Sequence, residues 1–467
     1  MIERRFRQTS GFDVSAEVLW TWHQRPGALE RLVPPWERTR IVERSDDMAP
    51  GSRTTLEVGL GPFKRLWVAE HRATEEPFTF RDVQVSGPFA AWSHTHRIEA
   101  GASGSSLLTD DVCYAVPFGR LGALVAGGIV RGKLESMFRY RHDVLRSDLA
   151  RHQRLQPSPV MKVLISGSSG FVGSALSAFL ASGGHEVWSL VRKRGNESVP
   201  ERSVAWDAET YAIESRDLEG FDAVVHLAGE NIAGKRWSAE QKRKIKDSRV
   251  DGTRALSEAL AKCTDKPRVL VSASAVGWYG NRGDERVTEL SEPGQGFLPE
   301  VCRAWEAATG AAEATGIRVV YMRTGVVLSP AGGALKKMLL PFKLGGGGVI
   351  GDGKQWMSWI ALDDLVGAYH FALTNERLAG PVNAVAPSAV RNYEFTKTLG
   401  KVLKRPTIVP LPAFAARAAF GEMADDLLLG GQHVRPMVLE NAGFHFDYPT
   451  LEGALRHVLG RERERAA

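Results

Sequence analysis

One short stretch constrains the fold of this chain more than any other, because an apolar run leads directly into regularly spaced glycines. The run is Val163–Ser166, and Gly167, Gly170 and Gly173 follow it at intervals of three residues. Apolar residues from Val172 to Leu180 then recur at helical spacing. A buried strand, a glycine loop and a helix in direct succession are typical of an α/β fold.

This glycine spacing predicts a site for phosphate groups. Glycine permits a tight turn, lets the backbone approach a pyrophosphate and allows a helix to pack closely on a strand. The helix N-terminus adds free N–H groups that favour an anion. We therefore expect a nucleotide to contact the following residues of the loop: Gly167, Ser168, Ser169, Gly170, Phe171, Val172 and Gly173.

A second apolar run, His185–Val191, follows at the distance expected of a β–α–β unit, and the residue that ends it indicates which nucleotide binds. An acidic residue there would accept a hydrogen bond from the ribose 2′-hydroxyl of NAD, whereas a cation accommodates the additional phosphate of NADP. This chain has Arg192, Lys193 and Arg194. We predict NADP rather than NAD, with Arg192 at the phosphate; the alternative is a basic surface loop.

Three further apolar runs lie at 221–227, 268–275 and 317–324, with helical patterns between them. Strands that alternate with helices predict a doubly wound parallel sheet from residue 161 onward. Small residues follow the first of these runs and are suited to a turn beneath a bound dinucleotide. They are Leu227, Ala228 and Gly229.

A polar stretch with two prolines, 151–160, separates this region from what precedes it. We predict a linker at 156–160, and the internal Met161 before a strand suggests a fusion of two proteins. Residues 1–155 carry apolar runs between turn signals, followed by a helical pattern over 121–149. This pattern predicts an α+β domain in which a sheet grips one long helix.

Three segments of that domain, Pro88–His96, Leu108–Gly119 and Phe138–His142, resemble the helix-grip superfamily of START domains and polyketide cyclases. The resemblance implies a hydrophobic cavity between sheet and helix. His94 and His96 share one strand face, but no third ligand stands at a metal-like spacing, so we predict no metal site. We expect Asp110 and Asp111 on opposite faces, as turn or rim residues.

The composition limits the class of protein further. Sixty basic and 54 acidic residues give a net charge of +6, which permits an anionic ligand without requiring nucleic acid. Three cysteines, Cys113, Cys263 and Cys302, form no metal spacing and favour a reducing, cytoplasmic compartment. The start lacks a signal peptide, and the longest apolar run, 121–130, is too short to span a bilayer. We expect a soluble protein with a small-molecule substrate, and an oligomer is possible.

The second region also resembles a known family. The motifs are Ser166–Gly173, His226–Ile232, Ser248–Thr253, Ser272–Gly280, Arg323–Leu328 and Gly351–Trp359. Together they are similar to an atypical extended short-chain dehydrogenase/reductase of the epimerase/dehydratase type, with a small C-terminal extension. The resemblance implies a nucleotide-binding and substrate domain over 161–390, an extension over 391–467, and Arg323 among the cofactor-binding residues.

In that superfamily a serine and a Tyr-x-x-x-Lys motif transfer the proton. Ser274 matches the serine, but Leu298 and Cys302 stand at the tyrosine and lysine positions, and neither can replace them at neutral pH. Glu230 and Lys235 are alternative proton donors or merely loop residues. Two functions stay open: an NADP-dependent oxidoreductase or isomerase, and an NADP(H)-binding sensor or carrier without turnover.

Glycine-rich segments after residue 328 are expected to form the substrate cleft. Four residues there either line the cleft or pack between lobes: Gln355, Trp356, Ser358 and Trp359.

Overall fold

The computed structural model describes residues 2–45, 48–60, 63–154, 159–193, 198–207 and 209–462. The chain divides into two compact units, each of which is described by itself. The first unit comprises Met1–Pro157, Ala178–Gly184 and Gly460–Ala467, and the second comprises Ser158–Ser177 and His185–Leu459. Most of the predicted linker at 156–160 falls outside the described residues.

The first unit contains an antiparallel sheet of seven strands in the order β1-β7-β6-β5-β4-β3-β2. The strands are β1 (Arg4–Phe12), β2 (Thr39–Arg44), β3 (Arg53–Leu60), β4 (Phe63–Arg72), β5 (Thr79–Ser86), β6 (Ala91–Ala100) and β7 (Ser106–Ala115). Along β6 buried and less buried residues alternate, because successive side chains point to opposite faces of a strand. One face of the sheet is therefore available to cover a core.

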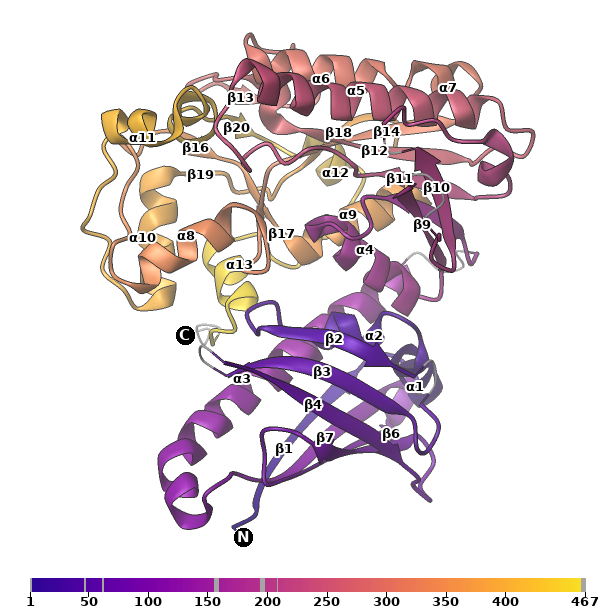
Figure 1. Ribbon diagram of the computed structural model, residues 1–467, viewed down its shortest axis with the longest axis vertical. Coiled ribbons are helices and arrows are strands. Elements are labelled where there is room, and N and C mark those ends of the chain that lie inside the picture. The colour runs from indigo at the N-terminus through magenta and orange to yellow at the C-terminus, as the bar shows by residue number, and fades with distance from the viewer. Residues whose placement is uncertain are drawn as a thin grey trace. The chain divides into compact units, whose positions relative to one another are not determined.

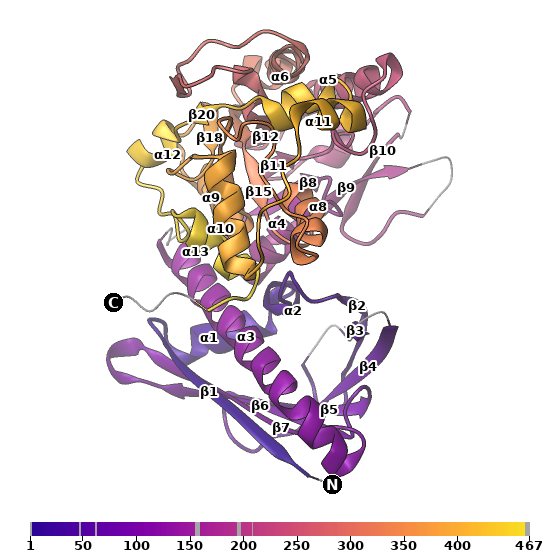
Figure 2. The ribbon, with the colours of Figure 1, turned by 90° about the vertical axis from the view of Figure 1, so that its left-hand side faces the viewer.

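A single long helix covers that face. Helix α3 (Gly119–Arg154) lies across β1, β6 and β7, as Figure 2 shows, and the shorter helices α1 (Ala16–Gln24) and α2 (Ala28–Leu32) pack beside it. Phe138 and Leu145 of α3 are buried against the sheet. The helix-grip fold is thus confirmed, whereas α1 and α2 were not predicted.

The described interior of this unit contains an aromatic cluster and a small cavity. Aromatic side chains such as Phe6, Trp92 and Phe138 pack in one cluster. Beside α3 lies a cavity of about 10 Å³ that is lined by both polar residues and leucines. The lining consists of His23, Leu32, His96, Leu108, Asp110, Arg141, His142 and Leu145.

The two neighbouring aspartates of β7 correct one expectation. Asp110 and Asp111 lie within the strand and not in a turn or at a rim. They do point to opposite faces, as predicted: Asp110 is buried on the helix side, whereas Asp111 pairs with Arg5 and Arg7 on the other face. Asp110 is therefore a buried carboxylate whose partners must come from the interior.

The second unit contains a parallel sheet of seven strands in the order β10-β9-β8-β11-β12-β14-β18. The strands are β8 (Lys162–Ser166), β9 (Glu186–Lys193), β10 (Ser203–Asp207), β11 (Ala223–His226), β12 (Val269–Ala275), β14 (Arg318–Thr324) and β18 (Gly380–Ala384). The strand order reverses between β8 and β11, which makes their carboxyl ends the switch point of a doubly wound fold. The predicted Rossmann-type sheet is confirmed.

Helices cover both faces of this sheet. In Figure 1, α5 (Ala239–Ala261), α6 (Phe297–Ala307) and α7 (Gly310–Ala314) lie on one side, and α4 (Phe171–Ser182) and α9 (Leu362–Thr374) lie on the other. Residues of β11 are buried on both faces, as expected of a parallel sheet between two helical layers.

The remaining helices and strands lie outside the seven strands of the sheet. They are β13 (Arg286–Val287), β15 (Val326–Leu328), α8 (Gly333–Lys343), β16 (Trp356–Met357), β17 (Trp359–Ala361), β19 (Val390–Arg391), α10 (Asn392–Leu403), α11 (Ala413–Phe420), β20 (His433–Val434), α12 (Met437–Asn441) and α13 (Leu451–Val458). Side chains of α8, β17, α10 and α13 share one hydrophobic cluster. The C-terminal segment is therefore packed into the second unit. Across the described residues, no helix is both long and apolar enough to cross a membrane.

We predict that Arg31→Ala strongly destabilises the first unit. Arg31 donates two hydrogen bonds, of 2.7 and 2.8 Å, to the fully buried Asp148. The variant removes a buried arginine that pairs with a buried carboxylate, and breaking a buried ion pair costs about 3–5 kcal/mol in the free energy of unfolding. Urea unfolding followed by tryptophan fluorescence measures the loss. The exposed pair of Arg7 and Asp111 is the control, and Arg7→Ala should cost less than about 1 kcal/mol. Equal losses in the two variants would contradict the prediction.

Candidate functional site

The glycine loop joins the end of β8 to the start of α4 at the carboxyl edge of the parallel sheet. Gly167 has a φ of +69°, a conformation that L residues with a side chain rarely adopt. The Gly170 N–H donates a hydrogen bond of 2.9 Å to the Gly167 carbonyl and closes the turn. A Cβ at Gly173 would lie 2.1 Å from the same carbonyl, so that only glycine allows α4 to pack this closely. The N-terminus of α4 thereby faces the edge at which phosphates are expected.

A buried serine fixes the two loops at the switch point. The Ser166 hydroxyl accepts hydrogen bonds from the N–H groups of Leu227 (3.0 Å) and Ala228 (3.1 Å). It also lies 2.8 Å from Nδ1 of His226, its register partner on β11. Burial lowers the pKa of His226 to about 4, so its ring is neutral at pH 7. Since the two N–H groups use the lone pairs of the hydroxyl, its proton points to His226 Nδ1.

Arg192 stands at the same edge as the loop. In the register of β8 with β9, Ser166 pairs with Leu190, so Arg192 lies two residues past the end of β8. Its side chain is exposed, and Lys193 ends the strand after it. The structure therefore has a cation where the 2′-phosphate of NADP was predicted. Arg194 lies outside the described residues.

The hydroxyl of Ser274, the predicted catalytic serine, is hydrogen-bonded to a buried ion pair. Its hydroxyl donates a hydrogen bond of 2.6 Å to Glu306 on α6. Two nitrogens of the Arg323 guanidinium donate to the two oxygens of the same carboxylate, at 2.9 and 2.8 Å. Because the proton of Ser274 is committed to Glu306, its oxygen is left as a hydrogen-bond acceptor.

Arg323, a predicted cofactor contact, is 3% exposed, and its described contacts are internal. A third guanidinium nitrogen donates to the Tyr279 hydroxyl at 3.1 Å, and the group lies 3.8 Å from the centre of the Trp278 ring. Tyr279 in turn donates to Asn383 at 2.7 Å. Burial raises the pKa of Tyr279 to about 12, so the phenol keeps its proton at neutral pH. These contacts join β14 and β18 to the 3₁₀ turn Val276–Tyr279 that follows β12.

The two positions of the missing Tyr-x-x-x-Lys motif lie side by side on α6. Leu298 and Cys302 are both buried, and a Cβ at Gly277 would lie 3.3 Å from Leu298 Cβ and 3.8 Å from Cys302 Sγ. The Cys302 thiol donates to the Ala275 carbonyl at 3.8 Å, and burial raises its pKa to about 12. The helix thus offers neither a phenol nor a cation at these positions.

The four residues proposed for the substrate cleft all contact other residues of the chain. Trp359 is fully buried and its indole N–H donates to the Ser388 carbonyl at 2.9 Å, so the packing alternative holds for it. Trp356 stacks on His433 with ring centroids 3.9 Å apart. The Ser358 hydroxyl donates to the Gln432 carbonyl, and the Gln355 amide donates to the carbonyls of Ile350 and Leu428. Glu230 and Lys235 are exposed on the loop after β11.

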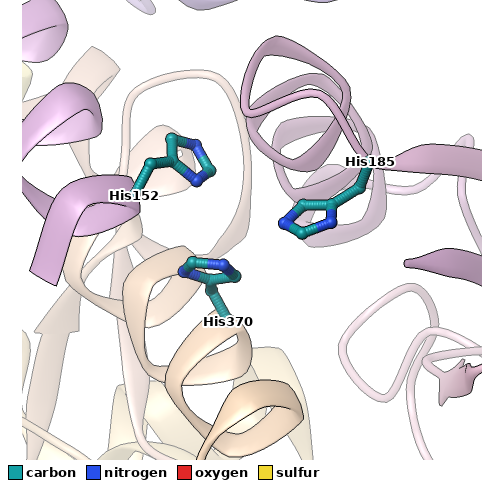
Figure 3. Close-up of side chains that lie close together, drawn as sticks. All are labelled: His152, His185 and His370. Atoms are coloured by element: carbon teal, nitrogen blue, oxygen red, sulfur yellow. The ribbon is translucent and has the colours of Figure 1, made fainter. Parts of the chain in front are cut away.

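Two histidines lie at the opposite edge of the sheet, where β8 and β9 begin. His185 and His370, drawn in Figure 3, have ring centroids 5.5 Å apart. Nδ1 of His185 accepts a hydrogen bond of 3.2 Å from the Met161 N–H. His152, also drawn in Figure 3, belongs to the first unit. Since the glycine loop follows the carboxyl end of β8, we assign these histidines no part in nucleotide binding.

The family models match three parts of the chain. Residues 163–385 match the NAD dependent epimerase/dehydratase family, 411–458 match a domain of unknown function, DUF1731, and 12–139 match polyketide cyclase/dehydrase and lipid transport. Epimerase family protein Mb2239 of Mycobacterium bovis is 46% identical over 299 residues, which cover 64% of this chain and 98% of that protein. The chain belongs to the epimerase family. Both resemblances stated from the sequence are thus confirmed.

Two solved structures are similar to this epimerase family member. A nucleoside-diphosphate sugar epimerase of Corynebacterium glutamicum is 35% identical, with a TM-score of 0.80. The match covers 97% of this chain and 90% of the solved chain. Human epimerase family protein SDR39U1, solved with NADPH, is 36% identical, with a TM-score of 0.59. The match covers 64% of this chain and 99% of the solved chain. The first similarity extends over both units, and the second over the part that resembles the epimerases.

Sequence reasoning missed several residues of this site. Ser166 and His226 each end a predicted strand, and adjacency of those strands was the signal that could have paired them. Glu306 gave no such signal, because it meets Arg323 only through the packing of α6 on the sheet.

We predict that only Cys113 reacts with iodoacetamide in the folded protein. Cys113 is exposed, whereas burial raises the pKa of Cys263 to about 11 and that of Cys302 to about 12. At pH 8 a thiol with a pKa near 12 is ionised in only about one molecule in 10⁴, and the thiolate is the reactive form. Peptide mass spectrometry before and after unfolding in urea measures the labelling. Cys113→Ser should abolish it in the folded state, and fast native labelling of Cys302 would contradict the prediction.

Proposed function

We propose that this epimerase family member is an NADP(H)-dependent oxidoreductase or isomerase of a small molecule. The observation that carries the proposal is the carboxyl edge of the parallel sheet, where the glycine loop, the start of α4 and the exposed Arg192 lie together. A cation at this position suits the 2′-phosphate of NADP. The human relative solved with NADPH supports the same preference.

Ser274 is the proposed catalytic residue. Its oxygen can accept a hydrogen bond from a substrate hydroxyl, because its own proton is donated to Glu306. In hydride transfer from an alcohol the hydroxyl proton must leave as the hydride departs. Ser274 would take up that proton as its own passes to Glu306. Arg323 would keep the carboxylate in place during this transfer.

A second function is favoured by one observation. Leu298 and the neutral Cys302 replace the tyrosine and the lysine that lowers its pKa in the wider superfamily. Without such a pair the protein would bind NADP(H) without turnover, as a sensor or carrier. A panel of alcohols, ketones and sugar nucleotides, followed at 340 nm with NADPH or NADP, distinguishes the two functions: any substrate-dependent change supports the enzyme, and cofactor binding alone supports the sensor.

For the first unit we propose binding of an apolar ligand, on the strength of the match to polyketide cyclase/dehydrase and lipid transport. The 10 Å³ cavity beside α3 has the volume of about one water, so side chains must move apart to admit such a ligand. Native mass spectrometry of the gently purified protein would report a bound ligand together with the cofactor and the oligomeric state.

We predict that Arg192→Ser weakens NADPH binding about 10- to 100-fold, the effect expected when one hydrogen bond to a charged group is lost. NADH binding should not change, because NADH lacks the 2′-phosphate. Isothermal titration calorimetry with both cofactors measures the two affinities. Arg216→Ser, which removes an exposed arginine from the 3₁₀ turn Ser215–Leu218, is the charge control. The proposal fails if Arg192→Ser weakens both cofactors equally.

If a substrate is found, we expect Ser274→Ala to lower kcat about 100- to 10,000-fold, in line with the loss of one proton-transfer group. The affinity for NADPH should stay the same, since the serine lies away from the glycine loop on another strand. Ser257→Ala removes a comparably buried hydroxyl that bonds to Thr309 and Ala312, and should leave turnover unchanged. Undiminished turnover in Ser274→Ala would rule out its catalytic role.

A further inference from the structure

We propose that the first unit binds one divalent transition-metal ion through Asp82, His94 and His96. Each residue offers one ligand atom, and the three atoms lie within 4.8 Å of one another. His94 and His96 are buried, whereas the Asp82 side chain is 23% exposed. The ligand set is therefore internal, with a partly open side at the carboxylate.

The pairing of the strands brings these residues together. Asp82 on β5 is the register partner of His94 on β6, and the side chains of such partners lie about 4.5–5.5 Å apart at Cβ. His96 follows two residues later and points to the same face. Asp110 on β7 is in turn the register partner of His96. Three adjacent strands thus place two carboxylates and two imidazoles on one patch of the sheet.

Asp110 holds His94 in the orientation that a metal requires, and it lies close to His96. It accepts a hydrogen bond of 2.9 Å from Nε2 of His94, and its Oδ1 lies 2.7 Å from Nδ1 of His96. Its other oxygen lies 2.5 Å from Nε2 of His142 on α3. Histidine ligands of metals commonly donate the second ring N–H to a carboxylate, which fixes the tautomer and leaves the other nitrogen for the ion. Asp110 occupies that supporting position for His94.

Asp82 also lies close to histidine side chains. One of its oxygens lies 2.6 Å from Nδ1 of His71, and the other lies 3.9 Å from Nε2 of His96. Two ligand atoms of one tetrahedral zinc ion are roughly 3.3 Å apart, given bond lengths of about 2.0–2.1 Å. A small rotation of the Asp82 side chain would bring its second oxygen to that separation.

The donor set indicates the class of metal. Two imidazoles and one carboxylate suit Zn²⁺, Fe²⁺ or Co²⁺, whereas Mg²⁺ and Ca²⁺ prefer sites made of oxygen atoms. Three protein ligands leave at least one coordination position for water. The 10 Å³ cavity bordered by His96, Asp110 and His142 has the volume of about one water molecule.

The test uses the full-length protein, stripped of metal with a chelator, and Co²⁺ as the spectroscopic probe. We expect one equivalent of Co²⁺ to bind, with visible ligand-field bands of a four- or five-coordinate site, and Zn²⁺ to displace it. Asp82→Asn and His96→Gln should each weaken Co²⁺ binding at least 100-fold. Asp110→Asn, which alters only the supporting carboxylate, should weaken it about 10- to 100-fold.

The control is His445→Gln, which changes an exposed histidine of the second unit and should leave Co²⁺ binding intact. Circular dichroism and the melting temperature check that each variant is folded; if His96→Gln is unfolded, Asp82→Asn decides, because its side chain is partly exposed. Two results would overturn the proposal. One is binding of less than about 0.1 equivalent of Co²⁺ by the wild type, which would leave a network of carboxylates and imidazoles without an ion. The other is unchanged binding in a folded Asp82→Asn.

Discussion

The close contact between Gly173 and the carbonyl of Gly167 is the constraint on which the cofactor edge depends. Any side chain at Gly173 would collide with that carbonyl, so α4 can approach β8 only with glycine at this position. That approach sets the direction in which the first turn of α4 presents its N–H groups. Ser166 then links the loop to the turn after β11 through its hydrogen bonds with Leu227 and Ala228. The loop and the turn are thus joined by hydrogen bonds within the chain itself.

Much of this architecture could be predicted from the sequence because the signals are local. A glycine spacing, an apolar run and a basic residue at the end of a strand are all read within about 30 residues, the length of one β–α–β unit. The parallel sheet and the position of Arg192 followed from them. Helices α1 and α2 escaped prediction, because they are only 9 and 5 residues long. Segments this short carry little periodicity.

The ion pair of Glu306 with Arg323 could not be predicted from local sequence patterns, because its two residues come from different elements. Arg323 opens one of the family motifs, and the resemblance placed it at the cofactor. The carboxylate that pairs with its guanidinium comes from α6, 17 residues earlier in the chain. A buried arginine needs a carboxylate, and no rule of spacing says which one packs against it. The Glu306 carboxylate of this pair also accepts the hydrogen bond from Ser274. A structural ion pair therefore governs the chemistry available to the predicted catalytic residue.

The cluster around Asp110 is likewise assembled from residues of different elements, here neighbouring strands of an antiparallel sheet. The sequence places His94 and His96 on one face through their spacing, and it supplies no third ligand within that strand. The additional carboxylates stand 12 residues before His94 and 14 residues after His96, on the strands to either side. Hairpin register brings them level with the histidines, and register depends on turn geometry and on which face is buried. A metal-like donor set can therefore be assembled by a sheet although no segment of the chain resembles a metal-binding motif.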